Sequence, residues 1–153
     1  MITTKNGMFF ETKIRREGIL ENGTQAKLNE LYVVRADSFT ETEARITEYV
    51  SSFASGEFEV LTEARAKYRE IFLSDKENES IFYKAVVAFI TLDEKSGKEK
   101  KSRVNYLVRA DSIEAAKKHI DEAFTDSMTS YVIQSVGETS IVDIVDAETT
   151  EEQ

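Results

Sequence analysis

The chain contains no cysteine, no proline and no tryptophan, and His119 is its single histidine. Without cysteine it cannot form a disulfide or a thiolate metal site. A single histidine excludes a centre built from several imidazoles. The six glycines form neither G-x-x-x-x-G-K nor G-x-G-x-x-G, and no G-x-S-x-G nucleophile motif is present. We therefore expect a protein that is not an enzyme and that carries no cofactor or metal.

Long apolar stretches are also missing. The longest apolar runs, such as residues 85–90, are far too short to cross a bilayer. The N-terminal residues lack the apolar segment of a secretion signal. Hydrophobic residues nevertheless make up 41% of the 153 positions, which is enough for a folded core. We expect a soluble cytoplasmic protein with no membrane partner.

Basic residues are fewer than acidic ones, 20 against 29, and the net charge is −9. Such a charge disfavours non-specific DNA binding. More than half of the excess lies in residues 143–153, which hold five acids and no base. We predict a single domain over residues 1–145 and an acidic, disordered tail over 146–153. That tail would either keep the protein soluble or compete with nucleic acid and recruit partner proteins.

An internal similarity organises the chain, since the sequence Val-Arg-Ala-Asp-Ser occurs at residues 34–38 and again at 108–112. Matching apolar positions extend the similarity on both sides. We predict two copies of one unit, over about residues 9–72 and 82–145, joined by a polar connector.

Each copy shows the same pattern of elements. Two β-rich segments flank a polar turn, at residues 9–16 and 28–35 and again at 82–92 and 103–110. A helix is expected to follow, because Ser38 with Glu41, and Asp111 with Glu114, have the spacing of a capping box.

One or two strands should follow each helix. Residues 57–68 alternate in polarity, which is typical of a strand. Residues 64–72 also suit a helix, but the matching residues 140–145 are short and β-branched, which favours strands in both places. The predicted fold class is α+β: a duplicated strand–strand–helix–strand unit forming a mainly antiparallel sheet with two helices on one face.

Basic residues close to aromatic residues in the two hairpins suggest a surface for single-stranded nucleic acid, which stacks its bases on aromatic rings. Lysine on exposed strands also protects against aggregation, and that alternative stays open. The candidate residues are Lys95, Lys98, Lys100, Lys101, Arg103 and Tyr106 in the second hairpin, with Lys13, Arg15 and Arg16 in the first.

The repeated Arg-Ala-Asp-Ser sequence suggests a second kind of site. An arginine beside a helix N-terminus can bind an anion, and Arg35, Ser38, Arg109 and Ser112 are the candidates. The structural alternative is that Asp-Ser caps the helix and the arginine pairs with a carboxylate.

Two further groups of residues are candidates for chemistry. Glu41 and Glu43, or Glu57, Glu59 and Glu63, could ligate a hard cation, and strand spacing would place the last three on one face. A solvated strand face is the alternative. His119 lies inside the predicted second helix, where we expect a solvated or half-buried side chain without a catalytic role.

Four segments of the chain, residues 9–13, 37–46, 56–60 and 89–101, resemble an uncharacterised family, domain-of-unknown-function family 4494 of Bacteroides-type bacteria and their phages. The likeness spans about residues 8–145. It implies a phage, prophage or mobile-element setting, in which small acidic non-enzymes serve replication, counter-defence or virion assembly. It assigns no role to any residue.

Together these observations lead us to expect a non-enzymatic binding module for single-stranded nucleic acid or a replication complex. One alternative is a protein that sequesters a small, nucleotide-like anion at the two helix starts. The other is a structural or protein-interaction subunit that forms a homo-oligomer through exposed sheet edges.

Overall fold

The computed structural model describes residues 2–147 of the chain, which divides into two compact units. Unit 1 comprises Met1–Asn6 and Tyr68–Thr139, and unit 2 comprises Gly7–Lys67 and Ser140–Gln153. Each unit is therefore assembled from segments that are far apart in the sequence.

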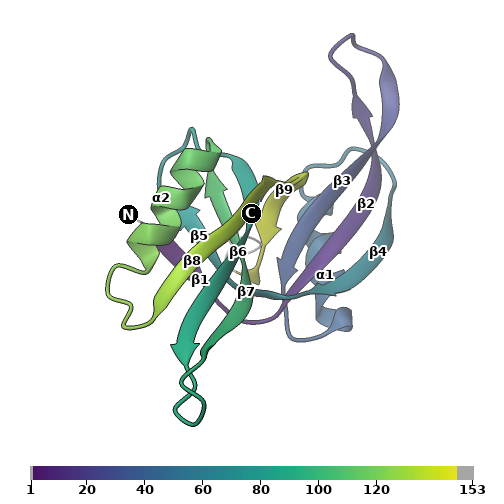
Figure 1. The fold of residues 1–153 in the computed structure, drawn as a ribbon. Coiled ribbons are helices and arrows are strands. Elements are labelled where there is room, and N and C mark those ends of the chain that lie inside the picture. The colour runs from purple at the N-terminus through teal and green to yellow at the C-terminus, as the bar shows by residue number, and fades with distance from the viewer. Residues whose placement is uncertain (1, 148–153) are drawn as a thin grey trace. The chain divides into compact units, whose positions relative to one another are not determined.

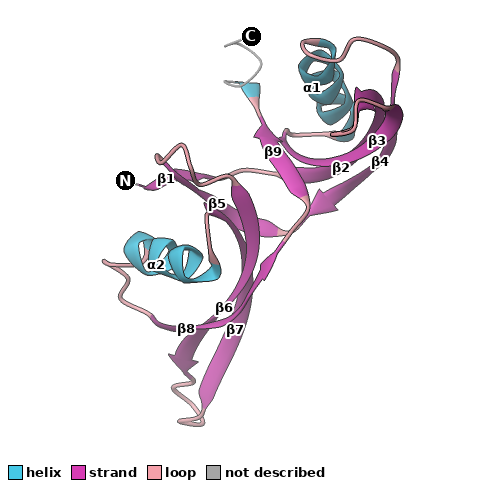
Figure 2. Ribbon diagram, turned by 90° about the horizontal axis from the view of Figure 1, so that it is seen from above, coloured by secondary structure: helices cyan, strands magenta, loops and turns pink. Residues whose placement is uncertain are grey.

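Unit 1 is a five-stranded sheet with the strand order β1-β5-β7-β6-β8 and one helix, α2 (Figure 1). β6 pairs antiparallel with both β7 and β8, whereas β5 runs parallel to β7 and antiparallel to β1. The helix lies against one face of this sheet (Figure 2). The elements are β1 (Ile2–Lys5), β5 (Tyr68–Ser74), β6 (Ile81–Leu92), β7 (Glu99–Ala110), α2 (Ile113–Ala123) and β8 (Ser130–Glu138).

The core of unit 1 lies between α2 and the sheet. Alternate residues of β6 and β7 face the helix, as the two-residue period of a strand requires. Ala116 and Ile120 of α2 pack on that face, and both are fully buried. The strand residues of this core are Phe72, Tyr83, Ala85, Val87, Tyr106, Val108 and Ala110.

Unit 2 is a four-stranded sheet with the strand order β4-β2-β3-β9 and one helix, α1. β2 pairs antiparallel with β3 and β4, and β9 runs parallel to β3. Its core contains Phe10, Ile14, Tyr32, Ile46 and Val50, all of which are nearly inaccessible to solvent. The elements are β2 (Phe9–Ile19), β3 (Gln25–Arg35), α1 (Phe39–Ser51), β4 (Phe58–Ala66) and β9 (Ile141–Val145).

The two units pair their strands in matching ways. Phe9 lies opposite Arg35 in unit 2, and Phe82 lies opposite Arg109 in unit 1. A register shift interrupts β2–β4 between Lys13 and Ile14, and another interrupts β6–β8 between Val86 and Val87. The duplication that the sequence suggests stays a prediction.

The α+β class is confirmed, but the strands described here form two sheets with one helix each. The prediction of one sheet with both helices on one face was wrong in this respect. Each helix has a single buried stripe, and its own hairpin covers that stripe. Residues 64–72 are extended, as predicted, and Lys67 separates them into β4 and β5.

A serine residue is the N-cap of each helix. Ser38 Oγ accepts a hydrogen bond from the Glu41 amide at 3.0 Å, as the capping-box spacing predicts. In α2 the cap is Ser112, whose Oγ accepts from the Ala115 amide at 3.1 Å. The prediction that Asp111 caps α2 was therefore wrong by one residue. No helix within residues 2–147 is long and apolar enough to span a membrane.

Candidate functional site

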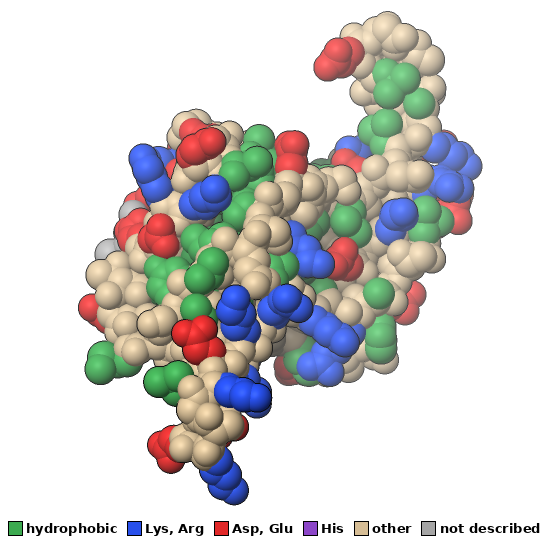
Figure 3. Space-filling model, viewed as in Figure 1, with side chains coloured by type: hydrophobic (Ala, Val, Ile, Leu, Met, Phe, Trp, Pro, Cys, Tyr) green, Lys and Arg blue, Asp and Glu red, His purple; other side chains and the backbone are tan. Residues whose placement is uncertain are grey.

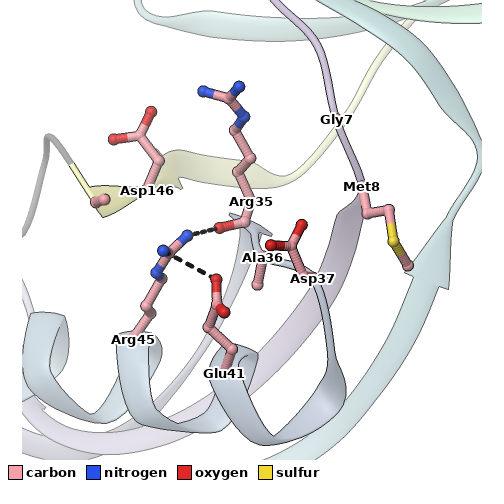
Figure 4. Close-up of a pocket in the computed structure, with 9 residues that line it drawn as sticks. Gly7, Met8, Arg35, Ala36, Asp37, Glu41, Arg45 and Asp146 are labelled. Carbon is pink, nitrogen blue, oxygen red and sulfur yellow. Dashed lines mark hydrogen bonds and ion pairs between the residues drawn. The ribbon is translucent and has the colours of Figure 1, made fainter.

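A pocket of about 270 Å³ lies in unit 2 where β3 ends and α1 begins (Figure 4). Its walls come from the residues before β2, the β3–α1 turn, the first two turns of α1, and the residues after β9. The lining residues are Gly7, Met8, Arg35, Ala36, Asp37, Glu41, Arg45, Asp146 and Ala147.

Local backbone interactions fix this corner of the unit. The Ala36 amide donates to the Met8 carbonyl at 3.1 Å, which holds the start of β2 beside the end of β3. Ser38 then changes the chain direction, since its extended backbone precedes the first helical residue. The turn thus places Arg35 and Asp37 at the mouth of the pocket.

Arg45 is already engaged by its neighbours. Its guanidinium donates to the Arg35 carbonyl oxygen and forms an ion pair with Glu41 at 2.9 Å (Figure 4). These contacts fasten α1 to the end of β3. They also neutralise both charges, so neither Arg45 nor Glu41 dominates the field in the pocket.

Arg35 differs from Arg45, because its guanidinium has no hydrogen bond or ion pair within the described part of the chain. The side chain is half-buried and extends toward the same side as Asp146 (Figure 4). It runs over Gly7, where an added Cβ would lie 3.1 Å from Arg35 Nε. Gly7 has φ +127°, a conformation that other residues rarely adopt, so glycine keeps this space open.

Carboxylates make the pocket mixed in charge. Asp37 is exposed, while Asp146 is only 2% exposed. An arginine without a partner attracts an anionic group, and the carboxylates accept hydrogen bonds from hydroxyl or amine donors. The arrangement suits a small ligand that has an acidic group at one end and donors at the other.

The four residues predicted for anion binding do not form one site. Arg35 and Ser38 lie in the β3–α1 turn of unit 2, and Arg109 and Ser112 lie in the β7–α2 turn of unit 1. Arg109 donates to the Ser74 carbonyl, although its Nε is buried without a hydrogen-bond partner among residues 2–147. Both serines cap their helices. Arg35 is therefore the member best placed to meet a ligand.

The predicted basic residues of the second hairpin are exposed. Figure 3 shows lysine and arginine side chains along the projecting β6–β7 hairpin, with acidic side chains among them. Arg103 Nε donates to Gln134 at 2.9 Å. The exposed members are Lys95, Lys98, Lys100, Lys101 and Arg103.

The prediction that Tyr106 contributes to a nucleic-acid-binding surface was wrong. Tyr106 is 2% exposed and stacks on Phe72, with 5.2 Å between the ring centroids. The alternation of β7 turns Tyr106 toward α2, so its ring belongs to the core and cannot stack on a base. The aromatic part of the predicted nucleic-acid surface is therefore missing at this position.

Two of the three basic residues predicted to bind nucleic acid in the first hairpin are engaged by other side chains. Arg16 forms an ion pair with Glu30 at 2.6 Å and lies over the Phe53 ring, 5.3 Å from its centroid. Arg15 Nε donates to Asn29 at 3.1 Å, and Lys13 is exposed.

The predicted row of glutamates is interrupted. Leu61 is the extra residue at the register shift, so Glu59 lies opposite Arg15 whereas Glu63 lies opposite Thr12. Arg15 and Thr12 are three residues apart on β2, so they point to opposite faces of the sheet. Glu59 and Glu63 pair with these two residues and therefore also point to opposite faces. The prediction that Glu57, Glu59 and Glu63 share one face was wrong. Within residues 2–147 no group of three or more acidic, histidine or cysteine residues could hold a metal ion.

Sequence reasoning missed a buried polar cluster in unit 1. His119 is 8% exposed rather than half-buried, and its Nε2 lies 2.6 Å from Glu79 Oε2. Ser74 Oγ donates to the other carboxylate oxygen at 2.8 Å. Because the serine hydroxyl contacts Glu79 and not His119, the histidine does not activate it as a nucleophile. The pairing joins residues 40 positions apart, and no spacing signal reveals it.

A family model described as a domain of unknown function, DUF4494, matches residues 8–147. The chain belongs to this family. No curated protein and no solved structure matches the chain. The DUF4494 description names no ligand or activity.

Proposed function

We propose that this DUF4494 protein is a non-enzymatic binding module that holds a small, nucleotide-like anion in the pocket beside Arg35. The observation that carries the proposal is that the guanidinium of Arg35, which lines the pocket, has no hydrogen bond or ion pair with residues 2–147. Its counterpart Arg109 is held by the Ser74 carbonyl and has no comparable freedom.

Charge and size define the ligand further. Arg35 would bind a phosphate or carboxylate through charge-assisted hydrogen bonds. Asp37 and Asp146 would accept from hydroxyl or amine groups and would repel a ligand that is anionic throughout. A volume of 270 Å³ lies at the lower end of ligand pockets and suits a mononucleotide or a smaller molecule.

Thermal unfolding of the full chain with inorganic phosphate and a panel of nucleoside monophosphates tests this proposal. We expect at least one nucleotide to raise the melting temperature, and Arg35→Ala to weaken its binding about tenfold or more, the loss of one charge-assisted hydrogen bond. Arg65→Ala is the control, because it removes an exposed arginine from the same unit. A wild-type melting temperature that no member of the panel changes would contradict the proposal.

Single-stranded nucleic acid is a second candidate ligand, supported by the exposed lysine and arginine side chains of residues 95–103 in the β6–β7 hairpin. β8 accompanies β6 only as far as Ile90, so the end of the hairpin projects as two strands. With Tyr106 in the core, binding would rest on contacts to phosphates and depend strongly on salt.

Fluorescence anisotropy with a labelled oligonucleotide tests the second candidate. We expect binding at about 50 mM salt that weakens steeply by about 200 mM. The double variant Lys100→Glu and Lys101→Glu should abolish it, whereas Lys117→Glu with Lys118→Glu, an equal charge change on α2, should retain most of it. Absence of binding at the lower salt concentration would reject this candidate.

A further inference from the structure

The two units have corresponding corners, where β3 ends and α1 begins in unit 2, and where β7 ends and α2 begins in unit 1. Strand pairing defines the correspondence, because β9 pairs with β3 at Val145 and Val34, and β5 pairs with β7 at Phe72 and Val108. Val34 and Val108 hold the same place in the repeated Val-Arg-Ala-Asp-Ser sequence. The residues that follow β5 therefore correspond to those that follow β9.

The helices correspond in the same way. Ser38 and Ser112 are their N-caps, so Arg45 of α1 and His119 of α2 lie equally far from the start of their helix. Arg45 pairs with Glu41 of its own helix. His119 instead takes its partner from outside the helix.

That partner is a carboxylate from the residues after β5, and it fills the corner of unit 1. Glu79 is 3% exposed, and its two oxygens lie 2.6 Å from His119 Nε2 and 2.8 Å from Ser74 Oγ. The Ser74 carbonyl accepts a hydrogen bond from Arg109, the counterpart of Arg35. An acidic residue five positions after Ser74 thus completes this corner.

The corner of unit 2 holds the Arg35 pocket, and residues 2–147 place no such carboxylate against the Arg35 guanidinium. The residues after β9 form part of the pocket wall, at Asp146 and Ala147. Residues 148–153 come next and lie outside the described residues. They contain three glutamates and no lysine or arginine. An acidic segment therefore starts from the wall of a pocket that has a cation without a counter-charge.

Position selects one glutamate of this segment. Ala147 corresponds to Ser74, because each lies two residues after the paired positions Val145 and Phe72. The residue five positions after Ala147 is Glu152. Five residues span up to about 17 Å, which is enough for the chain to return to the pocket wall from which it starts.

We infer that the Glu152 carboxylate binds the Arg35 guanidinium and occupies the pocket when no ligand is present. The contact is a charge-assisted hydrogen bond between groups that one chain holds close together, so no partner molecule is needed. The exposed carboxylate of Asp37 repels the segment, so the contact is weak enough for a ligand to displace. That Glu152 competes with a nucleotide-like anion rests on the proposed function.

A nitroxide label at the end of the segment measures the contact without any ligand. The chain has no cysteine, so Gln153→Cys in the full chain gives a single attachment point. We expect the label to broaden the nuclear magnetic resonance signals of the Ala36 and Asp37 amides, which lie beside the pocket. Reduction of the nitroxide provides the unbroadened reference spectrum.

Matched variants of the labelled chain identify the groups that make the contact. Arg35→Ala and Glu152→Gln should each reduce the broadening about twofold or more, because each removes one charge of the pair. Arg65→Ala and Glu148→Gln remove equal charges from the same unit and the same segment, and we expect them to preserve it. Broadening that Arg35→Ala leaves unchanged would overturn the inference. Broadening that comes from the label of a second chain in a mixed sample would overturn it as well.

Nucleotide affinity tests the competition. With the panel of nucleoside monophosphates, Glu152→Gln should bind about threefold or more tightly than the wild-type chain, because the site has lost its internal competitor. Equal affinity of the two proteins would overturn the competition. If neither protein binds a nucleotide, the proposed function fails, and the nitroxide measurement still decides whether Glu152 contacts Arg35.

Discussion

Replacing His119 with alanine is expected to lower the free energy of unfolding by about 3 kcal/mol. His119 Nε2 and Glu79 Oε2 lie 2.6 Å apart, and Glu79 is only 3% exposed. Truncation of the histidine leaves the buried carboxylate without the hydrogen-bond partner on this oxygen. Ser74 alone, with a single hydroxyl, cannot compensate for that loss.

Urea unfolding at neutral pH measures this effect. Lys118→Ala is the matched control on the same helix, because that side chain is exposed, and we expect a change within about 0.5 kcal/mol. Adding Glu79→Gln to His119→Ala should recover part of the loss, since a neutral amide costs less to bury than a carboxylate. A loss below about 0.5 kcal/mol in His119→Ala would show that the pair does not stabilise unit 1.

The same pair should appear in the pH dependence of stability. Burial disfavours the charged form of Glu79, but the hydrogen bonds from His119 and Ser74 outweigh it and lower its pKa below the ordinary 4.5. A carboxylate whose pKa is lower in the folded state contributes its stability above the unfolded-state pKa. That contribution is lost as the pH falls through the folded-state pKa. Glu79→Gln should therefore make the acid limb of the stability curve shallower.

Phe72→Ala is expected to cost about 3–5 kcal/mol, the largest loss that we predict. Phe72 is 1% exposed and belongs to β5. Its ring stacks on Tyr106 at 5.2 Å and meets the edge of Phe124 at 5.8 Å between centroids. Alanine would remove these contacts and leave a cavity between β5, β7 and the end of α2.

Chemical denaturation again provides the measurement. Phe72→Leu should lose less than Phe72→Ala, because leucine fills more of the space. Phe53→Ala serves as the control, since that ring is 45% exposed and its removal should cost much less. A loss below about 1 kcal/mol in Phe72→Ala would mean that β5 contributes little to the packing of unit 1.

Helix starts and hairpins could be predicted from the sequence, because residues that are close together in the chain determine them. Ser38 lies three residues before Glu41, and that spacing correctly predicts the start of α1. Polar turns between β-rich segments likewise predict both long hairpins. Arg35 was identified because it lies next to a helix start, which is also a property of neighbouring residues in the sequence.

The remaining features depend on contacts between distant residues. β5 and β9 each pair in parallel with a strand from the other half of the chain, which a short sequence pattern cannot specify. The extra residue at Leu61 reverses the face of Glu63, and nothing in the alternation before it marks that position. The burial of Tyr106 could not be predicted, because aromatic residues are common both in protein cores and in nucleic-acid-binding surfaces.

The route of the chain through the two units has a consequence for its synthesis. β2, β3, α1 and β4 leave the ribosome before β9, residues 141–145, which is the strand that covers the free edge of β3. Until those residues emerge, β3 presents unpaired backbone groups to any other extended segment nearby. Between its own synthesis and that of β9, the hairpin of β2 and β3 thus has an open edge, and in this period it is most exposed to mispairing.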